Sequence, residues 1–254
     1  DDDNDGIAAE VGEDSIDMGP DVIVGRLPIR TEAHAAAVVA KALQYEKNPA
    51  AANFAEKMLL SGVRLWNTGD AEAKSESMWD GWIDPYWDGV HYRFYDTATD
   101  FTGSGAYAVS PANLDAQLAN GYNFLHTATH GSNTSWGMES GGSYSSSWAG
   151  AVSNPDRYTN IGTIACNSNA FDAAEPSLSE AFIRNPNGGA VSFFGSSRYG
   201  WGITTLSSHG TSFRYDRMFY QFLFDGEPTT YPQHLGAVFT KMKEYYIGSC
   251  NWNG

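Results

Sequence analysis

Tyr122-Asn-Phe-Leu-His-Thr-Ala-Thr-His130-Gly-Ser and Asn160-Ile-Gly-Thr-Ile-Ala-Cys166-Asn are the two stretches that decide the fold of this chain. Each is a short apolar, β-branched run bounded by polar and glycine-rich segments, which is the pattern of a buried strand. In open parallel sheets chemistry collects at the carboxyl ends of strands, so neighbouring strands would bring His130 and Cys166 to one edge. A thiol next to an imidazole is the smallest set of side chains that can provide a cysteine nucleophile and its general base.

Strands and helices alternate on both sides of this stretch. Strands are predicted to end near Val24, Val63, Tyr95, His130, Cys166 and Gly195. Helices are predicted between them, beginning for example at Thr31, at Ser110-Pro111 and at the capping box Ser177-Leu-Ser-Glu180. The alternation predicts an α/β fold, a mainly parallel sheet with helices on both faces. Residues 65–104 are rich in Trp, Asp, Gly and Tyr and are predicted as a long irregular connection, either functional or anchored by packing.

The composition bounds the class of protein. The chain has 254 residues, 42% of them hydrophobic and 14% aromatic, enough to bury the core of one substantial domain or two small ones. A formal charge of −15 argues against a nucleic-acid partner and against an anionic membrane surface. No apolar run is long enough for a membrane span. The charge fits a secreted or cell-surface protein, or one that binds cations, with any export signal lying upstream or removed.

The acidic start of the chain, Asp1-Asp-Asp-Asn-Asp5-Gly6, matches the first half of a calcium loop. Alternate carboxylates converge on one cation, and the glycine makes the turn. Gly12 stands where such a loop usually closes with a glutamate, so a nearby glutamate would replace it. The segment therefore predicts structural calcium, with a solvated acidic terminus as the alternative. The candidate ligands are Asp1, Asp3, Asp5, Ile7, Glu10 and Glu13.

Each member of the predicted dyad has a competing interpretation. Cys166 and Cys250 are the only cysteines, so they could form a disulfide, or Cys166 could be an inert buried thiol. His126 shares the strand parity of His130 and competes with it. Gly131 favours His130, because a glycine at the end of the strand frees a backbone N–H for a developing oxyanion.

A series of segments extends this pattern across the chain. They are Pro20-Asp-Val-Ile-Val-Gly-Arg26-Leu-Pro, Tyr45-Glu-Lys47, His130-Gly-Ser-Asn-Thr-Ser-Trp136-Gly, Ile164-Ala-Cys166-Asn-Ser, Leu178-Ser-Glu180-Ala-Phe and Gly189-Ala-Val-Ser-Phe-Phe-Gly-Ser-Ser followed by Trp201. In this order they resemble the gingipain family of cysteine peptidases and, through it, the caspase-like fold. The resemblance runs from about residue 20 to residue 246. The His-Gly-Ser and Ala-Cys segments are its specific part.

The resemblance implies a division of roles around the dyad. Cys166 would be the nucleophile and His130 its catalytic partner. The backbone N–H groups of Gly131 and Cys166 would form the oxyanion hole. The substrate would be a protein or peptide, cleaved after a basic P1 residue as in arginine- and lysine-cleaving relatives.

The resemblance also places the pocket for the P1 side chain. Trp201 falls where the family has an aromatic residue over this pocket, and Ala128 and Ile164 would lie beside it. Arginine-specific members place an aspartate at the pocket base. The corresponding region here is residues 75–80, which offers Asp80 and Glu76 as candidates.

The chain divides into an acidic, calcium-binding segment, 1–19, and a caspase-like cysteine peptidase domain, 20–254. The domain lacks the first and last strands that the resemblance implies. The alternatives are a processed fragment, one chain of a nicked enzyme with a companion fragment of the same precursor, or a shortened piece made for expression. Two functions from different classes follow: a secreted cysteine endopeptidase, or a non-catalytic, calcium-stabilised binding domain on a peptidase fold. The first is favoured, because a binding domain has no need to keep both His130 and Cys166.

Overall fold

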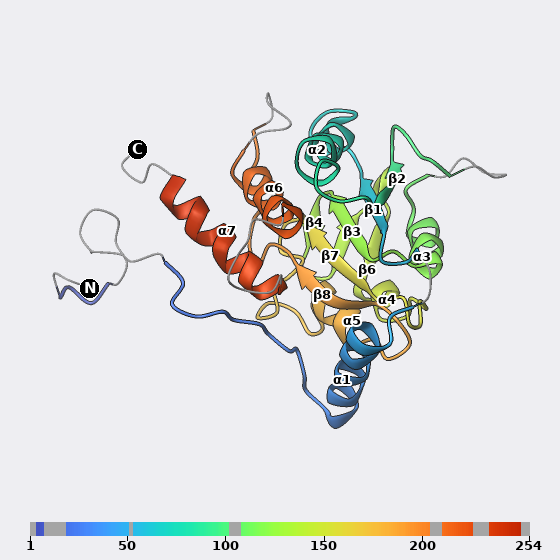
Figure 1. The fold of residues 1–254 in the computed structure, drawn as a ribbon, viewed down its shortest axis with the longest axis horizontal. Helices are drawn as coiled ribbons and strands as arrows, with labels where there is room; N and C mark the ends of the chain where they lie inside the picture. The colour runs from blue at the N-terminus through green and yellow to red at the C-terminus, as the bar shows by residue number, and fades with distance from the viewer. Residues whose placement is uncertain are drawn as a thin grey trace.

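The computed structural model describes residues 4–7, 19–50, 53–101, 108–203, 210–225 and 234–249, except for the side chain of Ser140. At its centre lies a five-stranded sheet with the strand order β2-β1-β3-β7-β8, in which every neighbouring pair is parallel (Figure 1). The predicted mainly parallel α/β sheet is confirmed. Its strands are β1 (Lys57–Gly62), β2 (Val90–Tyr95), β3 (Phe124–Ala128), β7 (Thr159–Thr163) and β8 (Ala190–Phe194).

Helices cover both faces of this sheet, as predicted. Side chains of successive strand residues point to opposite faces, so Leu59 and Leu60 of β1 belong to different core clusters. The cluster of Leu59 contains residues of α1 (Glu32–Lys47), α3 (Pro111–Asn120), α4 (Ser146–Ala149) and α5 (Leu178–Arg184). The cluster of Leu60 contains residues of α2 (Asp70–Met78), a π-helix (Trp79–Ile83), α6 (Thr211–Phe224) and α7 (Leu235–Ser249).

A small antiparallel sheet follows β3 directly. Its strands are β4 (Gly131–Ser132), β5 (Ser135–Gly137) and β6 (Ser143–Ser145), with a 3-10 turn at Glu139–Gly141 before β6. Trp136 and Tyr144 are fully buried and join the core cluster of Leu59. The residues after His130 are therefore part of the packed fold.

The expected strand ending near Val24 is wrong. Residues 22–24 form an extended segment outside the sheet, and the side chains of Val22, Ile23 and Val24 are 67%, 54% and 71% exposed. Figure 1 shows this segment passing along the side of β8 and α7 toward α1. It is tied to α5 instead, since Arg184 Nε donates to the carbonyl oxygen of Pro28 at 2.5 Å. A β-branched run without a paired neighbour has no hydrogen-bonded ladder and stays outside the sheet.

The expectation of an irregular connection over 65–104 is also wrong in part, because this region contains α2 and the π-helix. The predicted strand ending near Tyr95 is confirmed as β2. Packing explains two of its tryptophans. Trp79 is 3% exposed, and Trp87 stacks on Phe224 with ring centroids 4.8 Å apart. The composition of residues 65–104 is typical of a loop because the side chains that this region buries are aromatic rather than aliphatic.

A buried lysine joins α1 to α5 and to the start of β8. The Lys41 side chain is 2% exposed. Its ammonium donates to the carbonyl oxygens of Phe182, Gly188 and Ala190 at 3.2, 3.1 and 3.0 Å. These acceptors lie at the end of α5 and the start of β8, so one side chain satisfies carbonyl groups of two elements.

We expect Lys41→Met to lower the free energy of unfolding by roughly 3 kcal/mol, because the three buried carbonyl groups lose their donor. Urea denaturation followed by circular dichroism measures the change. Lys47→Met in the last turn of the same helix, where the side chain is exposed, is the matched control and should cost under about 0.5 kcal/mol. Equal stabilities of the two variants would contradict this account of Lys41.

Candidate active site

His130 and Cys166 follow the ends of two neighbouring strands. β3 and β7 pair in parallel from Phe124↔Asn160 to Thr127↔Thr163. His130 comes just after Ala128, the last residue of β3, and Cys166 just after Thr163, the last residue of β7. Both residues therefore lie at the same carboxyl edge of the sheet, as the sequence predicts.

The segments that carry the two residues touch each other at Gly131. A Cβ atom on Gly131 would lie 2.5 Å from the carbonyl oxygen of Cys166 and 2.8 Å from Cβ of Ala165. Any side chain at position 131 would push the two segments apart. The glycine after His130 is thus required by the close approach of the cysteine segment.

The thiol of Cys166 is half-buried and free, and Cys250, its predicted alternative disulfide partner, lies outside the described residues. The backbone N–H of Gly200 donates to Sγ at 3.2 Å. Gly200 belongs to the segment after β8, which also accepts a hydrogen bond at the Arg198 carbonyl oxygen from the N–H of Asn167 at 2.8 Å. The loop after β8 therefore folds against the thiol and orients it.

His130 is exposed, and its ring is oriented by a backbone carbonyl. Its Nε2 lies 2.7 Å from the carbonyl oxygen of Leu65, which follows β1. A carbonyl oxygen only accepts, so Nε2 carries a proton and donates it. In the neutral ring, Nδ1 is then the nitrogen that can accept a proton.

His126 has a different environment and is a satisfied core histidine. Its side chain is 1% exposed. Nε2 lies 2.7 Å from Oδ2 of Asp216, and Nδ1 lies 3.3 Å from Oγ of Ser75. Both ring nitrogens are occupied inside the protein, whereas His130 faces solvent at the strand edge.

The N–H of Gly131 points away from the hairpin that contains it. Gly137 N donates to the carbonyl oxygen of His130 at 2.7 Å, and Gly131 pairs with Trp136 in the antiparallel register. Hydrogen-bonded and non-hydrogen-bonded pairs alternate along such a ladder. The pair of Gly131 and Trp136 is therefore a non-hydrogen-bonded one, and this N–H remains free of the hairpin.

The loop that presents the Leu65 carbonyl is held by one buried carboxylate. Asp70, 4% exposed, accepts hydrogen bonds from the backbone N–H groups of Leu65, Trp66 and Asn67 at 2.9, 2.8 and 3.0 Å. Burial alone would raise the pKa of Asp70, but the three N–H donors and the charge of Lys74 together lower it below its usual value. Asp70 therefore fixes the loop that orients His130.

Asp70 and Leu65 are not among the site residues predicted from the sequence. The available signal is the segment Asn67-Thr-Gly-Asp70, a turn with a carboxylate at the start of a helix. Leu65 leaves no signal at all, because its contribution is a backbone carbonyl that any residue would supply.

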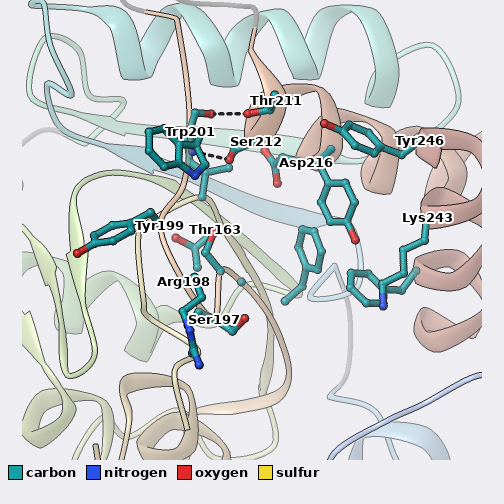
Figure 2. Close-up of a pocket in the computed structure, with 16 residues that line it drawn as sticks. Thr163, Ser197, Arg198, Tyr199, Trp201, Thr211, Ser212, Asp216, Lys243 and Tyr246 are labelled. Atoms are coloured by element: carbon teal, nitrogen blue, oxygen red, sulfur yellow. Dashed lines mark hydrogen bonds between the residues drawn. The ribbon is translucent and has the colours of Figure 1, made fainter. Parts of the chain in front are cut away.

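A cavity of about 470 Å³ opens beside the cysteine segment. It is lined by Ile164, Trp201 and Asp216, and on the side of α7 by Lys243 and Tyr246. Figure 2 shows Trp201 and the two α7 residues on opposite sides of Asp216. Trp201 is 69% exposed, so its indole forms an open wall. Trp201 and Ile164, two of the residues predicted around the P1 pocket, both line this cavity. The fully buried Ala128 packs against Ile164 in one cluster and is not among the lining residues.

The structure does not bring the predicted pocket carboxylates, Glu76 and Asp80, to this cavity. Glu76 accepts hydrogen bonds from Nε of Arg93 at 3.1 Å and from the Tyr95 hydroxyl at 3.0 Å, at the edge strand β2. Asp80 is exposed on the π-helix. The carboxylate that lines the cavity is Asp216, which is not predicted from the sequence because it lies on the apolar face of α6.

The predicted calcium segment lies mostly outside the described residues. Asp1, Asp3, Glu10 and Glu13 are outside, and of the candidate ligands only Asp5 and Ile7 are described. The N–H of Ile7 donates to Oδ1 of Asp5 at 2.8 Å, which closes a small turn. In the described part of the chain, no group of three or more His, Cys, Asp or Glu side chains is arranged to hold a metal ion.

Comparison with known proteins agrees with this geometry. Residues 2–253 match Peptidase family C25. The fold resembles the crystal structure of the Arg-specific cysteine proteinase gingipain R, with a TM-score of 0.71 and 16% identity over 91% of this chain and 51% of that chain. It also resembles the complex of Porphyromonas gingivalis RgpB pro- and mature domains, with a TM-score of 0.68 and 14% identity over 92% of this chain and 52% of that chain. The chain therefore spans about half the length of these structures.

No curated protein matches this chain. In the part of the chain that the structure describes, no helix is both long and apolar enough to cross a membrane.

We expect Asp70→Asn to lower the free energy of unfolding by about 2 kcal/mol at pH 7, because an amide cannot accept all three N–H groups. The folded-state pKa of Asp70 is depressed, so its contribution is complete above the unfolded pKa, near 4, and is lost as the pH falls through the folded pKa. Urea titrations between pH 3 and 7 should show the difference from wild type shrinking below about pH 4. The exposed Asp88→Asn is the control, and an equal loss in both variants would refute the role of Asp70.

Proposed function

Because the chain belongs to peptidase family C25, we propose that it is a cysteine endopeptidase in which Cys166 and His130 form the catalytic dyad. The resemblance to the gingipains predicted from the sequence is confirmed for family and fold. The single observation that supports the dyad best is the placement of a free thiol and a solvent-facing imidazole after the ends of two paired parallel strands. A histidine or a thiol with a purely structural role would not need to lie at the carboxyl edge of the sheet.

The chemistry follows from the positions of the donors and acceptors. Nδ1 of His130 takes the thiol proton, and Sγ of Cys166 attacks the scissile carbonyl carbon and forms a C–S bond. The imidazolium then gives its proton to the leaving amine as the C–N bond breaks, and water hydrolyses the thioester. The Leu65 carbonyl keeps Nε2 protonated throughout, so the ring exchanges protons only through Nδ1.

The oxyanion of the tetrahedral intermediate is proposed to bind the N–H groups of Gly131 and Cys166. The hairpin register supports this role, because it leaves the Gly131 N–H pointing away from the ladder. Loss of one such donor costs roughly 3 kcal/mol of transition-state stabilisation in other acyl-transfer enzymes. Gly131 cannot be replaced without displacing the Cys166 segment, so the donor and the nucleophile are fixed together.

The preferred P1 residue is proposed to be basic. The net charge of −15 attracts cationic peptides, and the cavity beside Ile164 combines the exposed Trp201 with the carboxylate of Asp216. A flat aromatic ring near a carboxylate suits a guanidinium, which stacks on the ring and pairs with the acid. One solved structure of similar fold is that of an Arg-specific proteinase. Glu76 is engaged by Arg93 and Tyr95, and Asp80 is exposed on the π-helix. Asp216 is therefore proposed as the pocket carboxylate in their place.

Three further features belong to this proposal. The enzyme is secreted or carried on the cell surface, as its acidic composition favours. It works on protein or peptide substrates and associates with a companion fragment of the same precursor. A solved structure of similar fold is a complex of pro- and mature domains. The acidic segment binds structural calcium through Asp1, Asp3 and Asp5, with Ile7 and Glu10 or Glu13, on the strength of the carboxylate spacing.

Fluorogenic peptides that differ only at P1 test the proposed activity. The wild-type protein should cleave after Arg or Lys, and Cys166→Ala should lower kcat at least about a thousandfold with the fold retained, because it removes the nucleophile. Cys250→Ala is the matched control and should stay active. A preference for acidic or apolar P1 residues would contradict the proposed preference for a basic P1 residue, without contradicting the proposed Cys166–His130 dyad. A folded, calcium-loaded protein that cleaves no peptide would favour the alternative of a non-catalytic binding domain.

Calcium binding by the acidic segment has its own test. A chelator should lower Tm by several degrees, since a ligand bound only to the folded state stabilises it by mass action. Added calcium should restore Tm, and the paired variant Asp3→Asn with Asp5→Asn should abolish the response. Asp21→Asn with Asp88→Asn removes the same charge elsewhere and serves as the control. An unchanged Tm in chelator would identify the segment as a solvated acidic terminus.

A further inference from the structure

A second buried lysine, Lys74 of α2, lies beneath the candidate active site. Its side chain is 3% exposed. Within the residues that the structure describes, its ammonium nitrogen has no hydrogen-bond acceptor. A buried ammonium group without acceptors is costly, and native proteins place one mainly where it has a role. Lys41, the other fully buried lysine, has three carbonyl acceptors, so burial alone does not explain Lys74.

The surroundings of the Lys74 ammonium have the composition of a cation-binding cage. It lies over the ring face of Phe213 and 5.4 Å from the ring centroid of Trp66. The carboxylates of Asp70 on α2 and Asp216 on α6 both attract it. Aromatic faces together with carboxylates are how proteins recognise a lysine or arginine side chain.

This cage adjoins the region where the P1 side chain is expected. Phe213 packs in one cluster with Ala128 and Ile164, the two strand-end residues predicted beside the P1 pocket. The Trp66 ring contacts Gly202, the residue after Trp201. Asp216 itself lines the cavity beside Trp201 (Figure 2).

The two carboxylates of the cage differ in how many hydrogen bonds their oxygens accept. Asp70 is engaged by three backbone N–H groups. Asp216 uses Oδ2 for His126 of β3, and its Oδ1 is buried without a hydrogen-bond partner among the described residues. An ammonium without an acceptor thus lies near a carboxylate oxygen without a donor. A bound guanidinium or ammonium group could donate to this oxygen of Asp216, in the place of the Lys74 ammonium.

We propose that Lys74 is an internal occupant of the cation site at the base of the P1 pocket, and that it sets how strongly the enzyme selects a charged P1 residue. This inference rests on the proposed peptidase function. When Lys74 is protonated, it offsets one of the two carboxylate charges and repels a basic P1 side chain. When Lys74 is neutral, Asp70 and Asp216 act on the substrate cation alone.

The titration of Lys74 gives the direction of the effect. Burial lowers the pKa of Lys74 to about 7, against the opposing attraction of Asp70 and Asp216. The other titratable group facing the site from β3 is His126, whose Nε2 lies on Asp216 and whose Nδ1 lies on Ser75. Selection of a charged P1 residue over an uncharged one should therefore increase as the pH rises through the neutral range.

Two peptides that differ only in carrying Arg or citrulline at P1 test this inference, because citrulline keeps the shape of arginine without its charge. The readout is the ratio of their kcat/KM values, in which titration of the Cys166–His130 dyad cancels. For the wild-type protein the ratio should rise about tenfold between pH 6 and pH 8, as one nearby charge is removed. In Lys74→Met the ratio should be high at every pH. Lys47→Met makes the same change of net charge on an exposed residue and should follow the wild type.

A ratio that stays flat with pH in the wild-type protein would overturn the role of Lys74, whether or not the variant folds. So would a folded Lys74→Met protein that keeps the wild-type ratio and the wild-type pH trend. Lys74→Arg, which retains the charge, should keep a low ratio at pH 6. Cleavage of both peptides with a flat ratio contradicts only this inference. Cleavage of neither peptide by the folded wild type contradicts the proposed peptidase function, and this inference with it.

Discussion

The parallel pairing of β1, β3 and β7 is the constraint on which the rest of the structure depends. Parallel neighbours share a carboxyl edge, so whatever follows each strand meets at that edge. Leu65, His130 and Cys166 follow the three strands and supply a hydrogen-bond acceptor, an imidazole and a thiol. Antiparallel pairing of any of these strands would send one of the three groups to the opposite edge. The arrangement of these three groups at one edge is thus a consequence of strand direction before it is a consequence of side-chain packing.

Buried charges then hold the connections between strands in place. Lys41, Asp70 and the pair His126–Asp216 are each almost fully buried, and each joins segments that are distant in the chain. A buried charge is tolerated where hydrogen bonds replace its lost hydration. Lys41 and Asp70 obtain those bonds from backbone carbonyl and N–H groups. Among the described residues the ammonium of Lys74 has no such acceptor, so the two buried lysines of this chain differ in how their charge is compensated.

Local patterns account for much of the fold and mislead where burial is unusual. The strand ends near His130 and Cys166, the helix caps at Ser110 and Ser177 and the helices around them are as predicted, because each depends on neighbours within one element. Residues 22–24 have the composition of a strand, yet they lie outside the sheet, since strand formation needs a paired neighbour. Residues 65–104 have the composition of a loop, yet they contain α2, because tryptophan packing stabilises the region.

By itself the sequence determined the alternation of strands and helices, the identity of the thiol and imidazole, and the glycine that lets their segments approach. These properties depend on residue type and local spacing. Only the tertiary structure decided which nitrogen of His130 is free, which carboxylate lines the cavity, and where the charge of Lys74 lies. Glu76 and Asp216 are equally acidic in sequence, but one faces Arg93 at the sheet edge and the other faces the cavity beside Trp201. The physical reason is that hydrogen bonds from backbone groups and burial between helices depend on positions that residues distant in the chain create together.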